Sequence, residues 1–256
     1  MTDEIFIFVE LYIEIMTLEE ILLHRRAVRR YDPDKPIDVN AVKECIRLAT
    51  LSPTSSNMQL WEAYHIINPI KLQELSIACL GQGSARTCKQ MVIFVTRQDK
   101  WKSHANAVLA ANIEEIKNNS PKDKQIHHIE LQNKYYKKLI PLTYKRCWGL
   151  LGVFRKVLTT FIGFKRPIPR NVTEADINTV VHKSCALAIQ TFMLAMSERG
   201  YDTCPLEGFD EFRVKKILNL PKESKVSMII TCGIRGIGGV RGDRFRLPLN
   251  EYYKLI

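Results

Sequence analysis

The chain contains 256 residues, of which 46% are apolar, enough for a hydrophobic core in one large or two small domains. This composition excludes a disordered chain, a coiled coil and a collagen-like repeat. The seven Cys form no C-x-x-C pair and the six His show no metal-ligand spacing, so the sequence predicts no disulfide framework and no metal site.

The formal net charge of +11 is concentrated in one segment. Residues 97–170 contain 16 Lys and Arg against 5 Asp and Glu, an excess of 11, whereas the rest of the chain has 22 of each sign. Such a segment attracts a polyanion or a phosphate-bearing cofactor without identifying it. Every long apolar run is broken by charges and no basic leader precedes the first one, so a cytoplasmic protein without a membrane partner is expected.

The first helix is indicated by a capping box. Thr17 and Glu20 have the spacing that closes the first turn of a helix, which we predict over residues 18–24. Residues 1–15 are expected to be an N-terminal extension, either an addition before a natural start at Met16 or an arm packed on the body. Asp38 caps a second predicted helix, over 39–51, whose apolar residues share one face.

The later elements alternate irregularly between strands and helices. We predict strands at 63–67, 91–96 and 226–232, helices at 70–78 and 182–199, a mostly helical stretch over 100–170, a loop from 200 to 208, and a helix that follows Asp210 and ends before Pro221. The run MVIFVT at 91–96 is expected at the centre of the sheet. This pattern predicts an α+β fold in a single domain, residues 16–256, with a helical excursion at about 100–170.

Known catalytic and nucleotide-binding motifs are missing from the sequence. The glycines near 81 and 236 do not complete G-x-G-x-x-G, and there is no P-loop lysine and no G-x-S-x-G nucleophile. No Cys/His dyad or pair of carboxylates stands out either. An enzyme with this sequence would therefore take its chemistry from a bound cofactor.

Arginines gather at the end of the first predicted helix and near the C-terminus. Arg25, Arg26 and Arg29 lie within five residues, and Arg244 and Arg246 alternate on a stretch expected to be an extended strand. The planar fork of a guanidinium group suits phosphate oxygens, so both clusters are candidate phosphate ligands. A solvated helix end and a charged strand edge are the structural alternatives.

Two polar segments offer further donors and acceptors. Residues 52–61 form a loop rich in hydroxyl and amide groups, which can bond a heterocycle or simply end a helix. Residues 204–210 enter a predicted helix, so their backbone N–H groups can point at an acceptor.

Taken in order, these segments resemble the FMN-dependent nitroreductase family. Residues 25–29 (RRAVR) resemble its R-R/H-S-x-R/K opening, 53–61 its P-S-S-x-N-x-Q-P-W loop, 205–210 its P-x-E-G-F-D segment, and 244–248 its closing K/R-x-R-x-P. The resemblance runs along nearly all of 17–250. Ala27, Thr54 and Leu60 depart from the family pattern, but none of these changes removes an essential charge.

The resemblance implies a central, mainly antiparallel sheet flanked by helices and an intertwined homodimer with FMN at two interface sites. It implies no catalytic side chain, because flavin N5 carries the chemistry. Arg25, Arg244 and Arg246 would hold the phosphate, and Arg29 would place a charge near the flavin pyrimidine edge. The full set of implied cofactor ligands is Arg25, Arg26, Arg29, Pro53, Thr54, Ser55, Asn57, Gln82, Pro205, Leu206, Glu207, Gly208, Arg244 and Arg246.

The implied reaction is ping-pong hydride transfer from NADH or NADPH through flavin N5 to a nitroaromatic, a quinone or a similar small molecule. The 100–170 excursion is expected to be a lid over this site or a dimer contact. A dehalogenase or an enoyl-type reductase with the same FMN is the alternative enzyme. A basic nucleic-acid-binding protein is a more distant alternative, so no nucleic-acid partner is expected.

Overall fold

The structure, a computed structural model, describes residues 16–256, so the extension expected at 1–15 lies outside the described residues. The strands are β1 (Trp61–Ile66), β2 (Gln90–Thr96), β3 (Asp202–Leu206) and β4 (Lys225–Gly233). The helices are α1 (Leu18–His24), α2 (Val39–Ala49), α3 (Pro69–Ala78), α4 (Gly83–Thr87), α5 (Trp101–Asn119), α6 (Lys122–Lys134), α7 (Ile140–Tyr144), α8 (Leu150–Ile162), α9 (Glu174–Glu198), α10 (Glu211–Leu218) and α11 (Leu249–Tyr252). Short turns of other helix types are η1 (Ser55–Asn57), η2 (Gln98–Lys100) and η3 (Tyr135–Leu139).

The sheet is antiparallel throughout, with strand order β1-β2-β4-β3. Strand β2 pairs on both sides and is buried along its whole length. Because successive side chains of a strand point to opposite faces, Phe94 packs into one core and Ile93 into the other. The α+β prediction and the central place of the MVIFVT run are confirmed.

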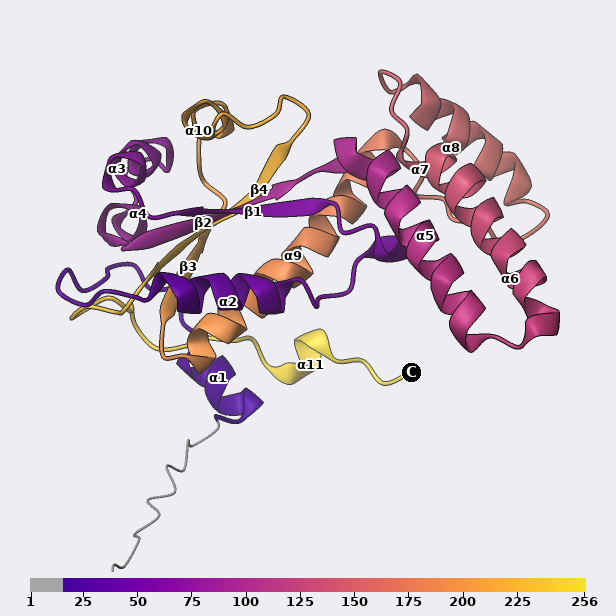
Figure 1. The fold of residues 1–256 in the computed structure, drawn as a ribbon. Helices are drawn as coiled ribbons and strands as arrows, with labels where there is room; N and C mark the ends of the chain where they lie inside the picture. Colours follow the sequence, from indigo (N-terminus) through magenta and orange to yellow (C-terminus); the bar gives the residue numbers. More distant parts are fainter. Residues whose placement is uncertain (1–15) are drawn as a thin grey trace, which may run out of the picture.

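Helix α9 packs across one face of the sheet together with α2 (Figure 1). Its Phe192 ring lies 5.5 Å from that of Phe94, measured between centroids, and neither is exposed to solvent. Among the described helices, α9 is long and apolar enough to cross a bilayer by length and composition. Its apolar side chains instead form the core beneath the sheet.

The opposite face of the sheet is covered by α3, α4 and α10 (Figure 1). The stretch from α5 to α8 forms a group of helices beside the sheet. A third core ties this group to the body, since Tyr136 and Ile140 pack there with Met58 and with Ile177 of α9.

Three predicted elements are wrong. The loop expected from 200 to 208 contains β3, an edge strand in which Pro205 is tolerated because one side of an edge strand needs no ladder hydrogen bonds. Helix α9 begins at Glu174 rather than at 182, because Thr173 and Asp176 form a capping box. The stretch from 244 to 248 is not a strand.

Candidate functional site

The arginine turn at 25–29 is clamped between β3 and the segment after β4. Ala27 forms a parallel bridge with Thr203, and the Val28 amide donates to the Thr203 carbonyl at 3.2 Å. On the other side, the Arg29 amide donates to the Gly239 carbonyl. The turn is thereby held rigidly at the edge of the sheet.

Buried polar contacts fix the base of this turn. The buried Tyr31 hydroxyl donates to the Thr231 carbonyl of β4 at 2.8 Å. Asp202, at the start of β3, accepts from the side chain of Arg235, which also donates to the His24 carbonyl at 2.8 Å. These contacts join the end of α1, the edge strand and the segment after β4 into one framework.

Four guanidinium groups crowd together beside the end of α1. Burial lowers the pKa of Arg25, and the nearby charges of Arg244, Arg246 and Arg26 lower it further. The pKa of Arg244 is lowered by the same kinds of cause. None of the four forms an ion pair with a carboxylate within residues 16–256. The cluster therefore holds unbalanced positive charge, which an anion such as a phosphate would neutralise.

Arg244 has a structural role as well. Its Nη2 atom donates to the carbonyls of Leu22, Leu23 and Arg25 at 2.8–3.0 Å, where the C-terminal carbonyls of α1 lack helical partners. A cation at this end of a helix also offsets the helix dipole. Arg244, a predicted phosphate ligand, thus uses its Nη2 atom to hold the C-terminal segment against the end of α1.

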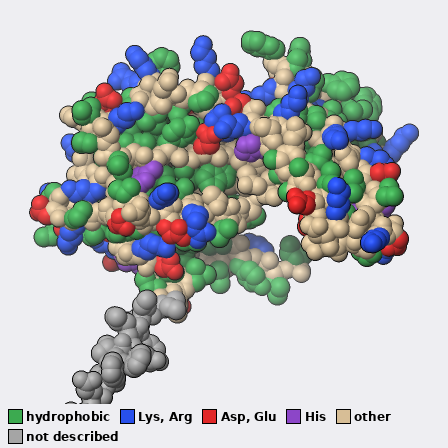
Figure 2. All heavy atoms as spheres, viewed as in Figure 1, with side chains coloured by type: hydrophobic (Ala, Val, Ile, Leu, Met, Phe, Trp, Pro, Cys, Tyr) green, Lys and Arg blue, Asp and Glu red, His purple; other side chains and the backbone are tan. Residues whose placement is uncertain are grey.

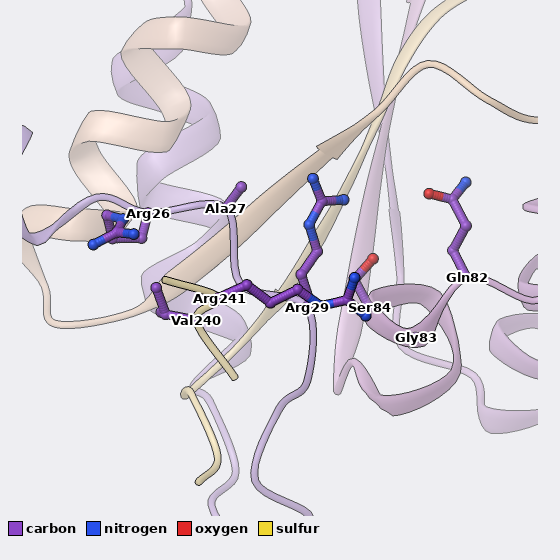
Figure 3. Close-up of a pocket in the computed structure, with 8 residues that line it drawn as sticks. All are labelled: Arg26, Ala27, Arg29, Gln82, Gly83, Ser84, Val240 and Arg241. Carbon is purple, nitrogen blue, oxygen red and sulfur yellow. The ribbon is translucent and has the colours of Figure 1, made fainter. Parts of the chain in front are cut away.

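A hollow of about 500 Å³ lies next to the arginine cluster. It is lined by Arg26, Ala27, Arg29, Gln82, Gly83, Ser84, Val240 and Arg241. Figure 3 shows the Arg29 side chain standing in the hollow, between Ala27 on one side and Gln82 and Ser84 on the other. Beneath this wall, the buried Ser84 hydroxyl lacks a hydrogen-bond partner among the described residues.

The turn at 205–208 borders this hollow. Gln82 Nε2 donates to the Gly208 carbonyl at 2.8 Å, which joins the turn to the wall of the first hollow. On the other side, Pro205 and Glu207 line a second hollow of about 440 Å³ over α9. Leu206 is buried within β3. The predicted ligands at 25–29, 82, 205–208 and 244–246 therefore lie near one another, around the arginine cluster and the first hollow.

The predicted loop at 53–57 lies elsewhere in the single chain. The Ser55 amide donates to Ser184 Oγ, and Pro53 lies in a hollow with Thr191 and Leu194. These α9 residues point to a different side of the helix from Gln190 and Met193, which line the hollow beside Pro205. Helix α9 therefore separates the loop from the arginine cluster.

Two predicted ligands in this loop bind within it. Thr54 Oγ1 accepts from the Gln59 amide at 3.1 Å, and Asn57 Oδ1 accepts from Gln59 Nε2 at 3.0 Å. Ser56, Asn57 and Gln59 all have positive φ angles, so these bonds stabilise an unusual backbone path. Their role toward a ligand stays a prediction.

Sequence reasoning missed Ser84 and Arg241 as lining residues. Neither belongs to a segment that resembles the family's motifs. The glycine-rich stretch 236–242 could have indicated that this segment approaches another part of the backbone. Gly239 does so, because an added Cβ would lie 2.4 Å from the carbonyl oxygen of Arg30.

The chain matches a known protein family along most of its length. Residues 22–234 match the model of the nitroreductase family. MhqN of Bacillus subtilis, named as a candidate NAD(P)H nitroreductase, is 40% identical over 70 residues, which cover 27% of this chain and 34% of MhqN. The chain thus matches about a third of the length of that relative.

Solved structures share the fold over almost the whole chain. A candidate nitroreductase from Exiguobacterium sibiricum, in complex with FMN, has a TM-score of 0.65 at 18% identity and covers 94% of this chain and 98% of its own. CLA-ER, an enone reductase of gut-bacterial fatty acid saturation, has a TM-score of 0.62 at 13% identity and covers 93% and 97%. From the extent of the family match and the shared fold, we conclude that this chain is a member of the nitroreductase family and an oxidoreductase.

Proposed function

We propose that the chain is an FMN-dependent oxidoreductase that uses NADH or NADPH to reduce a nitroaromatic, a quinone or a similar small electrophile. The observation that carries the proposal is the group of Arg25, Arg26, Arg244 and Arg246, whose charges repel one another and lack a carboxylate partner among the described residues. A phosphate monoester supplies the missing negative charge. The relative crystallised with FMN supports flavin as its carrier.

The residues around the hollows have separate proposed roles. The arginine cluster binds the phosphate, while Arg29 holds a positive charge beside the pyrimidine edge of the ring, where reduction adds negative charge. Backbone N–H groups at Glu207 and Gly208 orient the ring, and Gln82 fixes that turn through the Gly208 carbonyl. When bound, FMN supplies the chemistry by taking a hydride from the nicotinamide and passing the electrons to the acceptor in a ping-pong cycle.

An intertwined homodimer completes the proposed site. Helix α9 separates the 53–57 loop from the arginine cluster within one chain, so this loop would reach the flavin of the partner subunit. The C-terminal segment leaves Phe245, Leu249 and Tyr252 well exposed, which supports a partner that covers them. We place the enzyme in the cytoplasm.

The visible spectrum of the purified protein tests the proposal. We expect a yellow protein whose flavin absorbance bleaches when NADH or NADPH is added under nitrogen and returns when a quinone or nitroaromatic is added. A colourless protein that binds no added FMN would overturn the proposal. Nucleic-acid binding that weakens steeply with salt would then favour the alternative of a basic binding protein.

The second candidate reaction is reduction of an enone, and its support is the fold shared with CLA-ER. Dehalogenation with the same flavin is the third candidate reaction. Assays of the reduced protein with an acceptor of each class distinguish these reactions, because an acceptor reoxidises the flavin only if the pocket admits and orients that acceptor.

A further inference from the structure

Helix α8 carries most of its large apolar side chains on the outside of the protein. Leu150, Phe154, Val157 and Phe161 follow the three-to-four-residue spacing of one helix face, and all are more than half exposed. The opposite face, which contacts the protein, holds Gly152, Arg155 and Thr159, all buried. This distribution reverses that of an ordinary surface helix.

The outward orientation of α8 is fixed by close packing of its inner face. A Cβ added to Gly152 would lie 2.8 Å from the backbone nitrogen of Glu174, so the helix approaches α9 more closely than any other residue type would allow. Lys156 Nζ donates to the Arg170 carbonyl at 2.9 Å, and Arg155 donates to the carbonyls of Lys145 and Val172. A roll that turned the apolar face inward would break these contacts.

The apolar face extends beyond both ends of the helix. Trp148, before α8, is 99% exposed, and Phe164, after it, is 79% exposed. Figure 2 shows hydrophobic side chains gathered at the upper right, where Figure 1 places α8, with Lys and Arg side chains among them. In water this surface is unfavourable, so something of matching chemistry is expected to cover it.

The charge around α8 indicates the chemistry of a surface that could cover it. Residues 131–173 contain ten Lys and Arg but no Asp or Glu. Lys145 and Arg146 precede the helix, and Lys165, Arg166 and Arg170 follow it, all exposed. Cations at both ends of an apolar face with Trp and Phe are the features of a helix that lies in the interface of an anionic membrane. There, long basic side chains reach the headgroups while the rings enter the acyl boundary.

We propose that the face made by Trp148, α8 and Phe164 docks on the surface of a lipid bilayer that contains anionic lipids. A nucleic acid would use the cations and leave the apolar face in water. A second copy packed over α8 would bring like charges together in either direction: a parallel copy sets basic start against basic start, and an antiparallel copy sets basic start against basic end. The sequence predicts no membrane partner, because no spanning segment and no secretion leader is recognised in it. A helix that lies in the membrane interface needs neither.

Vesicle flotation of the full-length protein tests the docking. We expect it to float with vesicles of phosphatidylcholine and phosphatidylglycerol, and less with phosphatidylcholine alone or at high salt. The Trp148 emission should shift to the blue on binding, and Trp148→Phe should abolish that shift. The double variant Phe161→Ser, Phe164→Ser should lower the partition coefficient about tenfold or more. These residues are exposed, so the free energy of unfolding should hardly change.

The matched control is Ile126→Ser, which removes an equally exposed apolar side chain from α6, outside the docking face. It should bind vesicles like the unaltered protein. Equal binding by the double variant and the control, or no binding to the anionic vesicles, would overturn the proposal. If the unaltered protein bound no vesicles and the double variant had a lower oligomeric state, a second copy of the chain would be what covers the face.

Discussion

Replacement of Arg25 by Gln should weaken phosphate binding while making the unliganded protein slightly more stable. The Arg25 side chain lies beside Arg26, Arg244 and Arg246, and their charges together with burial lower its pKa. A hydrogen bond to a charged group contributes about 1.5–3 kcal/mol. Its loss should therefore raise the Kd for FMN by about 10-fold to 150-fold.

The same substitution removes repulsion in the unliganded state. Because Arg25 is only partly buried, solvent screens this repulsion, and we expect a gain of only about 0.2–1 kcal/mol in the free energy of unfolding. Arg30→Gln is the matched control, since it removes one positive charge from the same turn outside the cluster. Fluorescence titration with FMN and urea unfolding measure the two effects. An Arg25→Gln protein that binds FMN as tightly as the Arg30→Gln control would refute the assignment.

Three further predictions concern the framework behind the site. Phe192→Ala leaves a cavity beside Phe94, and urea unfolding should show a loss of about 3–5 kcal/mol, whereas a loss below about 1 kcal/mol would contradict its core position. Gly233→Ala places a Cβ 2.6 Å from the buried Tyr31 ring and should cost about 1–3 kcal/mol; an unchanged melting temperature would argue against this contact. Burial lowers the pKa of His65, so the folded state resists its protonation, and stability should fall as the pH drops below 6.5. His65→Gln should flatten that slope between pH 7 and 5, and an unaltered slope would count against the effect.

The central elements could be predicted from sequence because their patterns are local. The MVIFVT run is buried on both faces, so its apolar character is continuous and its length fits a strand. The capping box of Thr17 and Glu20 marks the start of α1 correctly, because both partners lie within one turn. The same motif at Thr173 went unrecognised, since its third residue inside the helix is Asp rather than the usual Glu.

The candidate site depends on contacts that no local pattern contains. Arg25 and Arg244 could be assigned to one phosphate only through the resemblance to a family, because 219 positions separate them along the chain. The bridge between Ala27 and Thr203 brings the Arg25 segment to the edge of the sheet, and it involves residues without a distinctive side chain. The Arg244 segment joins it through hydrogen bonds to backbone carbonyls, which any residue could offer. The β3 strand was missed for a similar reason: its Asp202 and Pro205 disfavour a strand, yet pairing with β4 imposes one.

The orientation of α8 could not have been predicted from its composition. Its spacing indicates an amphipathic helix, which would normally turn its apolar face inward. The close approach at Gly152 and the buried Arg155 reverse this, and both depend on tertiary contacts with the start of α9 and its flanking loop.

A comparison of FMN with riboflavin tests most directly whether the arginine cluster holds a phosphate. The two ligands share the ring and the ribityl chain and differ only in the phosphate group. With two or more charge-assisted hydrogen bonds to the phosphate, the Kd for FMN should be at least about 100-fold lower than that for riboflavin. Equal affinities for the two ligands would contradict the account, because the four guanidinium groups would then serve no phosphate.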